Sequence, residues 1–157
     1  MPVEIERKFL VTSDDWRAGS VPAQIVQGYL SRDPDRIVRV RLRDDEAFLT
    51  VKGRSSGITR AEIEFPIPID TARDLLPLCL DPSIEKIRHE VIVGSHKWEV
   101  DEFLGASAGL VVAEVELGSE EEVFQIPGWI GLEVSQDFRY TNSYLSEHPY
   151  SLWSQNE

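Results

Sequence analysis

Hydrophobic and polar residues alternate along much of the 157-residue chain, which is the pattern of β-strands with one apolar and one polar face. In the opening stretch EIERKFLV, for example, Glu4, Glu6 and Lys8 share one face, and apolar residues occupy most of the other. Alternation of this kind, bounded by Gly-, Asp- and Ser-rich turn sequences, predicts strands near residues 3–11, 24–31, 36–43, 47–53, 60–67, 84–93, 97–103 and 110–117. The chain is therefore expected to be mainly β.

Segments with helical periodicity are fewer than the predicted strands. They predict helices near residues 13–17, 70–78, 119–125 and 137–146. Asp70 or Thr71 is the expected N-cap of the second helix, and Ser119 precedes the third. We expect these helices to cover parts of the outside of the sheet, in an α+β arrangement within one domain over residues 1–157.

Ionisable side chains recur two residues apart on most of these strands, usually with one sign per strand. Arg39 and Arg41 share a face, as do Glu62 and Glu64. On a single strand this describes a solvated surface, but like charges on one face repel, so many such strands need compensation from strands of opposite sign. Closing about eight antiparallel strands into a barrel, with charged faces inward and apolar faces outward, would supply part of this charge compensation and would also remove the sheet edges.

An outer-membrane barrel also alternates in this way, but the sequence disfavours that class. Glu4 and Glu6 lie where the apolar core of a signal peptide is needed, and no run approaches the roughly 20 apolar residues of a spanning helix. Cys79 is the single cysteine, so a disulfide framework is excluded, and we expect it to be a small buried hydrophobe. These features favour a cytoplasmic protein.

The overall charge narrows the ligand class. A net charge of −12 argues against broad nucleic-acid binding but allows a small anion in a locally basic site. Clustered carboxylates attract Mg²⁺, and clustered Arg and Lys side chains bind phosphate oxygens. A lumen that holds both suits a triphosphate that arrives with its metal.

Glu4, Glu6 and Lys8 form an E-x-E-x-K motif, which is followed in order by QGYLS, VRVRLR, LTVKG, AEIEFPI, EKIRHEV, WEVDEF, GLVVAEVEL and PGWIGLEVSQDFRYTNSYL. With these segments the chain resembles the short bacterial members of the CYTH family, the triphosphate tunnel metalloenzymes. The resemblance covers most of the chain. It implies an eight-stranded antiparallel β-tunnel, dependence on Mg²⁺ or Mn²⁺, and attack on a triphosphate inside the tunnel.

The resemblance also implies site residues. The metal-binding carboxylates are Glu4 and Glu6 on the first strand and Glu114 and Glu116 on the last, and further lumen acids that hold a second metal or orient basic groups are Glu62, Glu64 and Asp101. The phosphate-binding cations are Lys8, Arg39, Arg41, Lys52, Lys86 and Arg88, with Arg139 reaching the substrate from the C-terminal segment. Lys8 and Tyr29 form a pair that orients or deprotonates the attacking water, although a packing role for Tyr29 stays open.

Hydrolysis of inorganic tripolyphosphate to phosphate and diphosphate is the first expectation. Adenylyl cyclase activity, hydrolysis of thiamine triphosphate or nucleoside triphosphates, and a polyphosphate-binding module without turnover are the alternatives. We expect no nucleic-acid or membrane partner, and the oligomeric state, a homodimer included, stays open. Residues assigned to packing or structural roles are Trp16, Trp98, Trp129, Trp153 and His89, whereas His96 and His148 lack metal-ligand spacing.

Overall fold

The structure is a computed structural model that describes residues 1–153. Its strands are β1 (Val3–Val11), β2 (Val21–Ser31), β3 (Ile37–Arg43), β4 (Glu46–Lys52), β5 (Thr59–Pro66), β6 (Leu80–Val93), β7 (His96–Phe103), β8 (Val111–Glu116) and β9 (Ile130–Glu133). Its α-helices are α1 (Ile69–Leu75) and α2 (Asn142–Glu147). Short 3₁₀ segments are η1 (Asp15–Arg17), η2 (Leu76–Leu78), η3 (Gly105–Ser107), η4 (Phe138–Tyr140) and η5 (Tyr150–Leu152).

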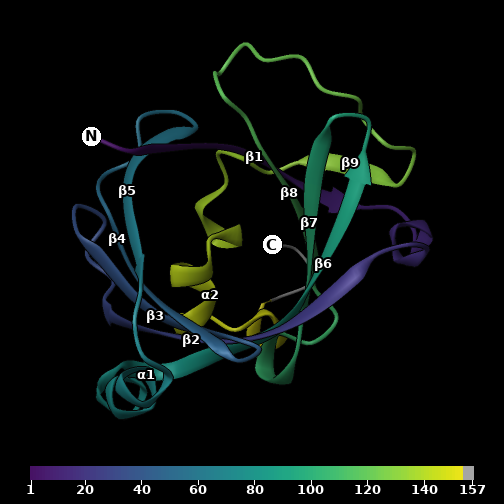
Figure 1. Ribbon diagram of the computed structural model, residues 1–157. Helices are drawn as coiled ribbons and strands as arrows, with labels where there is room; N and C mark the ends of the chain where they lie inside the picture. The colour runs from purple at the N-terminus through teal and green to yellow at the C-terminus, as the bar shows by residue number, and fades with distance from the viewer. Residues whose placement is uncertain (154–157) are drawn as a thin grey trace.

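Eight of these strands close into an antiparallel barrel, which Figure 1 views along its interior. The strand order is β5-β4-β3-β2-β6-β7-β8-β1, and pairing of β1 with β5, for example Val3 with Ala61, closes the ring. The predicted closed barrel is confirmed. The ninth strand, β9, was not predicted; it is short and pairs along β1 through Phe9 and Glu133.

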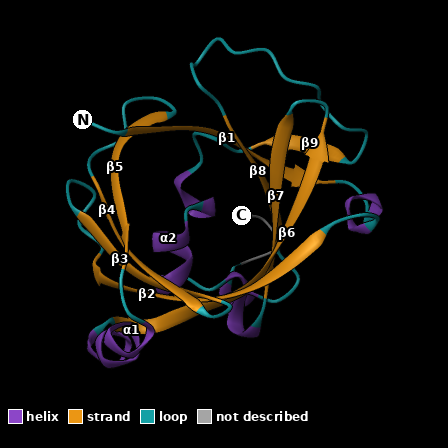
Figure 2. Cartoon of the chain, in the orientation of Figure 1, coloured by secondary structure: helices purple, strands orange, loops and turns teal. Residues whose placement is uncertain are grey.

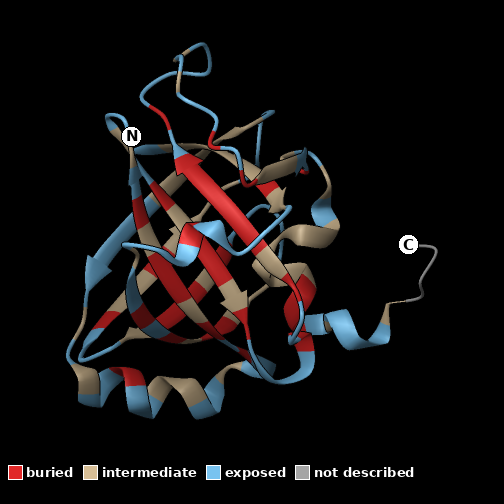
Figure 3. Ribbon diagram, turned by 90° about the vertical axis from the view of Figure 1, so that its right-hand side faces the viewer, coloured by how far each residue is buried: buried red, intermediate tan, exposed pale blue. Residues whose placement is uncertain are grey.

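The main apolar core lies outside the barrel wall, as the inward charged faces require. Phe9, Trp98 and Val115 project outward from β1, β7 and β8 and join Trp16 and Trp129 in one buried cluster. In Figure 3 the buried residues follow the strands, whereas the long loop between β8 and β9 is mostly exposed. The packing roles predicted for these tryptophans are confirmed.

Of the two other predicted packing residues, His89 lies beside this core and Trp153 packs against a second buried cluster, which includes Phe103 and Leu145. His89 is largely buried on the outer face of β6, with its ring centroid 4.7 Å from that of Trp16. Trp153 packs edge-on against Tyr140 and Tyr150, at centroid separations of 5.3 and 5.2 Å. Cys79 is half-buried rather than buried, because it sits at the margin of the smaller cluster under α1.

Truncating the centre of the outer core tests this arrangement. Trp98 is fully buried, so Trp98→Ala is expected to lower the free energy of unfolding by about 3–5 kcal/mol. Leu132, 70% exposed on β9, provides the control, and its alanine variant should stay within about 0.5 kcal/mol of the parent. Urea denaturation measures both. A loss below about 1 kcal/mol for Trp98→Ala would contradict the assigned core.

The helix predictions need several corrections. Segment 13–17 forms only the 3₁₀ turn η1, and 119–125 forms a turn followed by irregular chain. The expected helix over 70–78 is α1 followed by η2. Pro68 is its N-cap residue, with no side-chain capping bond, so the Asp70 or Thr71 cap was wrong. No described helix is long and apolar enough to cross a bilayer.

The most consequential correction concerns α2. We expected every helix to cover the outside, and α1 does lie there, against β3 and β4. Helix α2 instead lies in the barrel interior, where it contacts β6 (Figures 1 and 2). Its first residue, Asn142, bonds Gln27 and Lys86 on the barrel wall. The C-terminal segment therefore closes one end of the interior.

Candidate active site

A cavity of about 270 Å³ occupies the barrel interior between α2 and the open end. Its lining is dominated by charged side chains: Glu4, Glu6, Lys8, Arg39, Arg41, Arg43, Lys52, Arg60, Glu62, Glu64, Arg88, Glu99, Glu114 and Glu116. Smaller contributions come from Tyr29, Ile37, Ser55, Gly57, Ile58, Ser135, Thr141, Asn142 and Ser143. The predicted charged lumen is therefore present.

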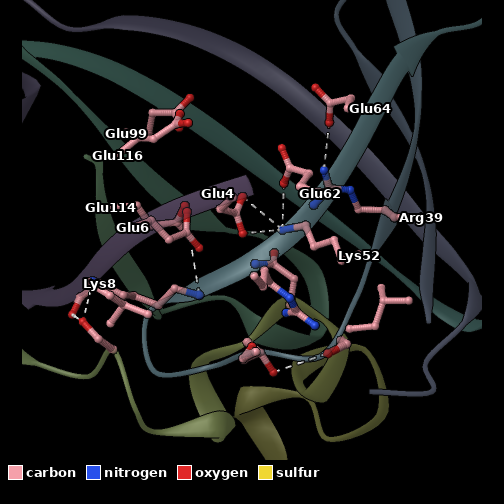
Figure 4. A pocket seen from close by; sticks show the side chains of 18 of the residues that line it. Glu4, Glu6, Lys8, Arg39, Lys52, Glu62, Glu64, Glu99, Glu114 and Glu116 are labelled. Carbon is pink, nitrogen blue, oxygen red and sulfur yellow. Dashed lines mark hydrogen bonds and ion pairs between the residues drawn. The ribbon is translucent and has the colours of Figure 1, made fainter. Parts of the chain in front are cut away.

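Strand register brings these groups together. Glu6 on β1 lies opposite Glu116 on β8, and Lys8 lies opposite Glu114. Residues directly opposite on neighbouring strands point to the same face, so the E-x-E-x-K motif and the late E-x-E pair form one continuous inner surface. Figure 4 shows Glu6, Glu99, Glu114 and Glu116 along one wall of the cavity.

This acidic wall carries more negative charge than its neighbours offset. Burial, together with the charges of Glu114 and Glu4, raises the pKa of Glu6 to about 8. Burial also raises the pKa values of Glu4 and Glu116. Glu114 differs: burial alone would raise its pKa, but Lys8 and Arg88 lower it to about 2. The wall is thus a place where additional positive charge is stabilised.

Two lysines link the acidic wall to the rest of the cavity. Lys52 Nζ lies 3.0 Å from Glu4 Oε1 and 3.3 Å from Glu62 Oε2, as the dashed lines in Figure 4 mark. Lys8 Nζ lies 3.5 Å from Glu114 Oε1 and donates a hydrogen bond to the Tyr140 carbonyl at 3.1 Å. Both ammonium groups are therefore held by the protein itself.

The basic side of the cavity centres on three arginines. Arg39 Nη2 lies 3.3 Å from Glu64 Oε2, and Arg88 forms a bidentate pair with Asp101, at 2.8 and 2.9 Å. Within residues 1–153, no carboxylate forms an ion pair with Arg41; its Nε donates to Gln27 Oε1 at 2.8 Å, and Asp101 acts only at longer range. Burial and the neighbouring arginines lower the pKa of Arg41 to about 9. Arg41 is the clearest candidate for binding an added anion.

The carboxylates fit a hard divalent cation by their chemistry. Glu4, Glu6, Glu114 and Glu116 offer oxygen ligands, which Mg²⁺ and Mn²⁺ prefer. In the described chain, no three His, Cys, Asp or Glu groups already converge as a ready ligand set. Mg²⁺ commonly takes only one or two protein carboxylates and completes its shell with phosphate oxygens and water, so a preformed cluster is not required.

Three predicted site residues do not line the cavity. Lys86 and Asp101 are buried beneath its floor, where Lys86 Nζ lies 2.7 Å from Asp101 Oδ2. Arg139 forms an ion pair with Asp137, with Nη2 2.7 Å from Oδ2. Their positions favour support of the site over direct contact with a ligand.

Several lining residues were missed by the sequence analysis. Glu99 and Arg60 continue the same alternation that identified their neighbours, so a signal was available. Arg43, at the end of the basic strand, also lines the cavity and pairs with Glu90. Ser135 and Asn142 come from the C-terminal segment, where no periodicity indicated an inward path.

The sequence and fold of this chain are similar to those of known proteins. The CYTH domain model matches residues 2–144. An inorganic triphosphatase of Acetivibrio thermocellus is 48% identical over 151 residues, which cover 96% of this chain and 97% of that protein. An inorganic triphosphatase of Nitrosomonas europaea is 37% identical over 91% of this chain and 96% of its own length.

Solved structures agree with this relationship. The crystal structure of an inorganic triphosphatase aligns with a TM-score of 0.66 at 34% identity, and the alignment covers 93% of this chain and 95% of that one. The family model alone spans residues 2–144, which include all the barrel strands and therefore the charged residues of the lumen that they carry. Since the family model and both relatives span nearly its full length, the chain belongs to the CYTH domain family.

Proposed function

We propose that this protein is a divalent-metal-dependent triphosphatase that hydrolyses inorganic tripolyphosphate to phosphate and diphosphate inside the barrel. The observation that carries the proposal is Arg41, a buried cation that faces the cavity and, among residues 1–153, is held only by a neutral amide. A buried charge without a counter-ion is costly, and a bound phosphate group removes that cost. The names of the two similar proteins support the same activity.

The lining favours an inorganic substrate over a nucleotide. Among the described residues that line the cavity, Tyr29 is the single aromatic one, and it is 3% exposed. A nucleobase pocket usually supplies aromatic or apolar faces for stacking, whereas this cavity supplies mainly charges. Three linked phosphates need only such charges.

Each wall has a proposed role. Glu4, Glu6, Glu114 and Glu116 would hold Mg²⁺ or Mn²⁺, with Glu62 and Glu64 available for a second ion. When bound, the metal neutralises charge on the phosphate oxygens during phosphoryl transfer. Arg39, Arg41, Arg88 and Lys52 would fix the phosphate chain, Arg through its planar fork and Lys as a point charge. Positioning of the phosphate chain and neutralisation of its charge are the main contributions of a protein to phosphoryl transfer.

The proposed water-orienting pair is Lys8 and Tyr29. Both line the cavity, but Tyr29 Oη is 3.4 Å from Gln27 Nε2, and no described hydrogen bond joins it to Lys8. A ligand-free site often shows catalytic hydrogen bonds that are long or absent, so the geometry permits the pair. The proposed pair requires that Lys8 and Tyr29 contact the same water molecule in the cavity.

Tyr29→Phe tests that pair. If the Tyr29 hydroxyl orients the attacking water, or its phenolate form takes the proton of that water, kcat should fall about 100-fold while KM changes less than about threefold. Steady-state phosphate release at saturating metal measures both constants. An unchanged kcat would assign Tyr29 to packing and leave the triphosphatase proposal intact.

The function itself is tested by phosphate release from tripolyphosphate with Mg²⁺ or Mn²⁺, with an EDTA-treated sample as the metal-free control. Equal amounts of phosphate and diphosphate are expected, with ATP a poorer substrate. Cyclic AMP and diphosphate from ATP would indicate the cyclase alternative. Binding of tripolyphosphate without product would indicate a module without turnover, and would contradict the proposal. The single domain over 1–157, the cytoplasmic location and a homodimer stay predictions.

A further inference from the structure

Two neutral amides lie beneath the basic side of the cavity. Gln27 projects inward from β2 and is fully buried, and Asn142 begins α2. Gln27 Oε1 accepts a hydrogen bond from Arg41 Nε at 2.8 Å, and Gln27 Nε2 donates to Asn142 Oδ1 at 3.2 Å. The same Asn142 oxygen accepts from Lys86 Nζ at 2.8 Å. One amide pair therefore contacts two buried cations.

Strand pairing makes the first contact specific. Gln27 lies directly opposite Arg41 in the β2–β3 register, so their side chains share the inner face of the barrel. Ile25 and Tyr29, the neighbours of Gln27 on that face, offer no amide or carboxylate acceptor. Gln27 is thus the acceptor that sets the orientation of the Arg41 fork.

The neutrality of these amides is unusual within the site. Five of the other cations that line the cavity are held by carboxylates: Arg39 by Glu64, Arg88 by Asp101, Lys8 by Glu114, Lys52 by Glu4 and Arg43 by Glu90. Arg60, which also lines the cavity, is only partly buried and donates to the Gly53 carbonyl, so Arg41 is the buried cation with a neutral partner among the described lining residues. A carboxylate partner offsets most of the charge that a phosphate would meet. An amide forms the hydrogen bond and leaves the full positive charge in place.

We propose that Gln27 and Asn142 are positioning residues for triphosphate binding: they fix Arg41 and the adjacent Lys86 by neutral hydrogen bonds, so that Arg41 keeps its charge for a phosphate group. The inference rests on the proposed function for the identity of the anion. It adds that, among the buried cations of residues 1–153 that line the cavity, Arg41 is left without a carboxylate partner, and that both the barrel wall (Gln27) and the C-terminal segment (Asn142) contribute to this arrangement. A purely structural role would need the hydrogen bonds but would be indifferent to this neutrality.

The distinguishing change is from amide to carboxylate at constant shape. Gln27→Glu keeps the acceptor for Arg41 and adds a counter-charge, which stabilises the buried Arg41 while weakening its hold on phosphate. It also replaces the Nε2 donor to Asn142 Oδ1 with an acceptor, so the new ion pair offsets a lost hydrogen bond. We expect the thermal midpoint to stay within about 3 °C of that of the parent, with tripolyphosphate affinity reduced at least about 10-fold. Affinity would then fall without a matching loss of stability, which loss of structure cannot produce.

Asn142→Asp provides a second variant that acts on Arg41 indirectly, because Asn142 reaches Arg41 through Gln27 and Lys86 already pairs with Asp101. It places a carboxylate next to Lys86 and in the first turn of α2, where negative charge suits the helix. Gln24→Glu is the matched control, since Gln24 lies on the same strand but points to the exposed outer face. Its affinity should stay within about twofold of the parent.

Binding is measured by titration calorimetry of the full chain with tripolyphosphate in EDTA, so that it does not depend on turnover. KM and kcat with Mg²⁺ are measured in parallel, and a rise in KM with kcat within about threefold is expected. Affinity within about threefold of the parent in both Gln27→Glu and Asn142→Asp would overturn the proposal, and so would a fall in affinity that matches a fall in thermal midpoint. Failure of the parent chain to release phosphate would count against the proposed function alone.

Discussion

Replacing Glu4 and Glu6 together with glutamine should reduce metal-dependent turnover to less than about 1% of the parent rate. Both carboxylates line the cavity from β1, and the amides keep their shape while removing two negative charges from the acidic wall. The fold should persist, because the amide at position 4 still accepts a hydrogen bond from Lys52. Initial rates across a Mn²⁺ titration and a thermal melt give the two readouts.

The matched control removes two carboxylates from the outside. Glu85 and Glu121 are exposed and do not line the cavity, so Glu85→Gln with Glu121→Gln should leave the rate within about twofold of the parent. Direct Mn²⁺ binding, followed by electron paramagnetic resonance, should weaken only in the Glu4 and Glu6 variant. Parent-like turnover and metal affinity in that variant would remove both residues from the proposed metal site.

Arg41→Ala should produce the second large effect. Arg41 is buried beside the cavity, and no carboxylate in the described part of the chain pairs with it, so a bound phosphate would supply its charge-assisted hydrogen bonds. Each such bond contributes about 1.5–3 kcal/mol, which corresponds to a rise in KM of about 10- to 100-fold per bond. Calorimetric affinity and steady-state KM measure the loss.

Two companion variants sharpen this test. Arg41→Lys keeps the charge but loses the planar fork, so it should recover only part of the lost affinity. Arg73→Ala removes an arginine that is exposed on α1, outside the barrel, and should leave both KM and kcat unchanged. Equal constants for Arg41→Ala and the parent would exclude Arg41 from phosphate binding.

The barrel and its charged interior were predictable from the sequence because two independent signals coincide. Alternation alone assigns a polar face to each strand, and the repetition of like charges, as at Arg39 and Arg41, makes solvated faces unfavourable in combination. Strand ends were close to those observed. The short β9 was missed because its four residues, IGLE, are too few to show an alternation of apolar and polar side chains.

The path of the C-terminal segment was not predictable in the same way. Residues 137–146 read as helical, and a helical period says which side is apolar without saying which surface it meets. The interior position depends on contacts with distant residues, such as Lys86 and Gln27 with Asn142. Those contacts link residues that lie 56 and 115 positions apart in the chain.

The sequence also did not indicate how deep each inward-facing residue lies within the barrel. Lys86 and Asp101 share the inward parity of the other site residues, so the sequence placed them in the lumen. In the structure they pair with each other below the cavity floor and support Arg88 and Asn142 instead. Alternation gives the face of a residue but not its height along the barrel, which strand stagger and α2 decide.

A crystal structure of the chain with tripolyphosphate and Mn²⁺ is the most direct test of the central claim. The account predicts anomalous scattering from manganese beside Glu4, Glu6 and the β8 carboxylates, and phosphate oxygens within hydrogen-bond distance of Arg41. Metal and triphosphate bound on the outer surface, with an interior that holds only solvent, would contradict it.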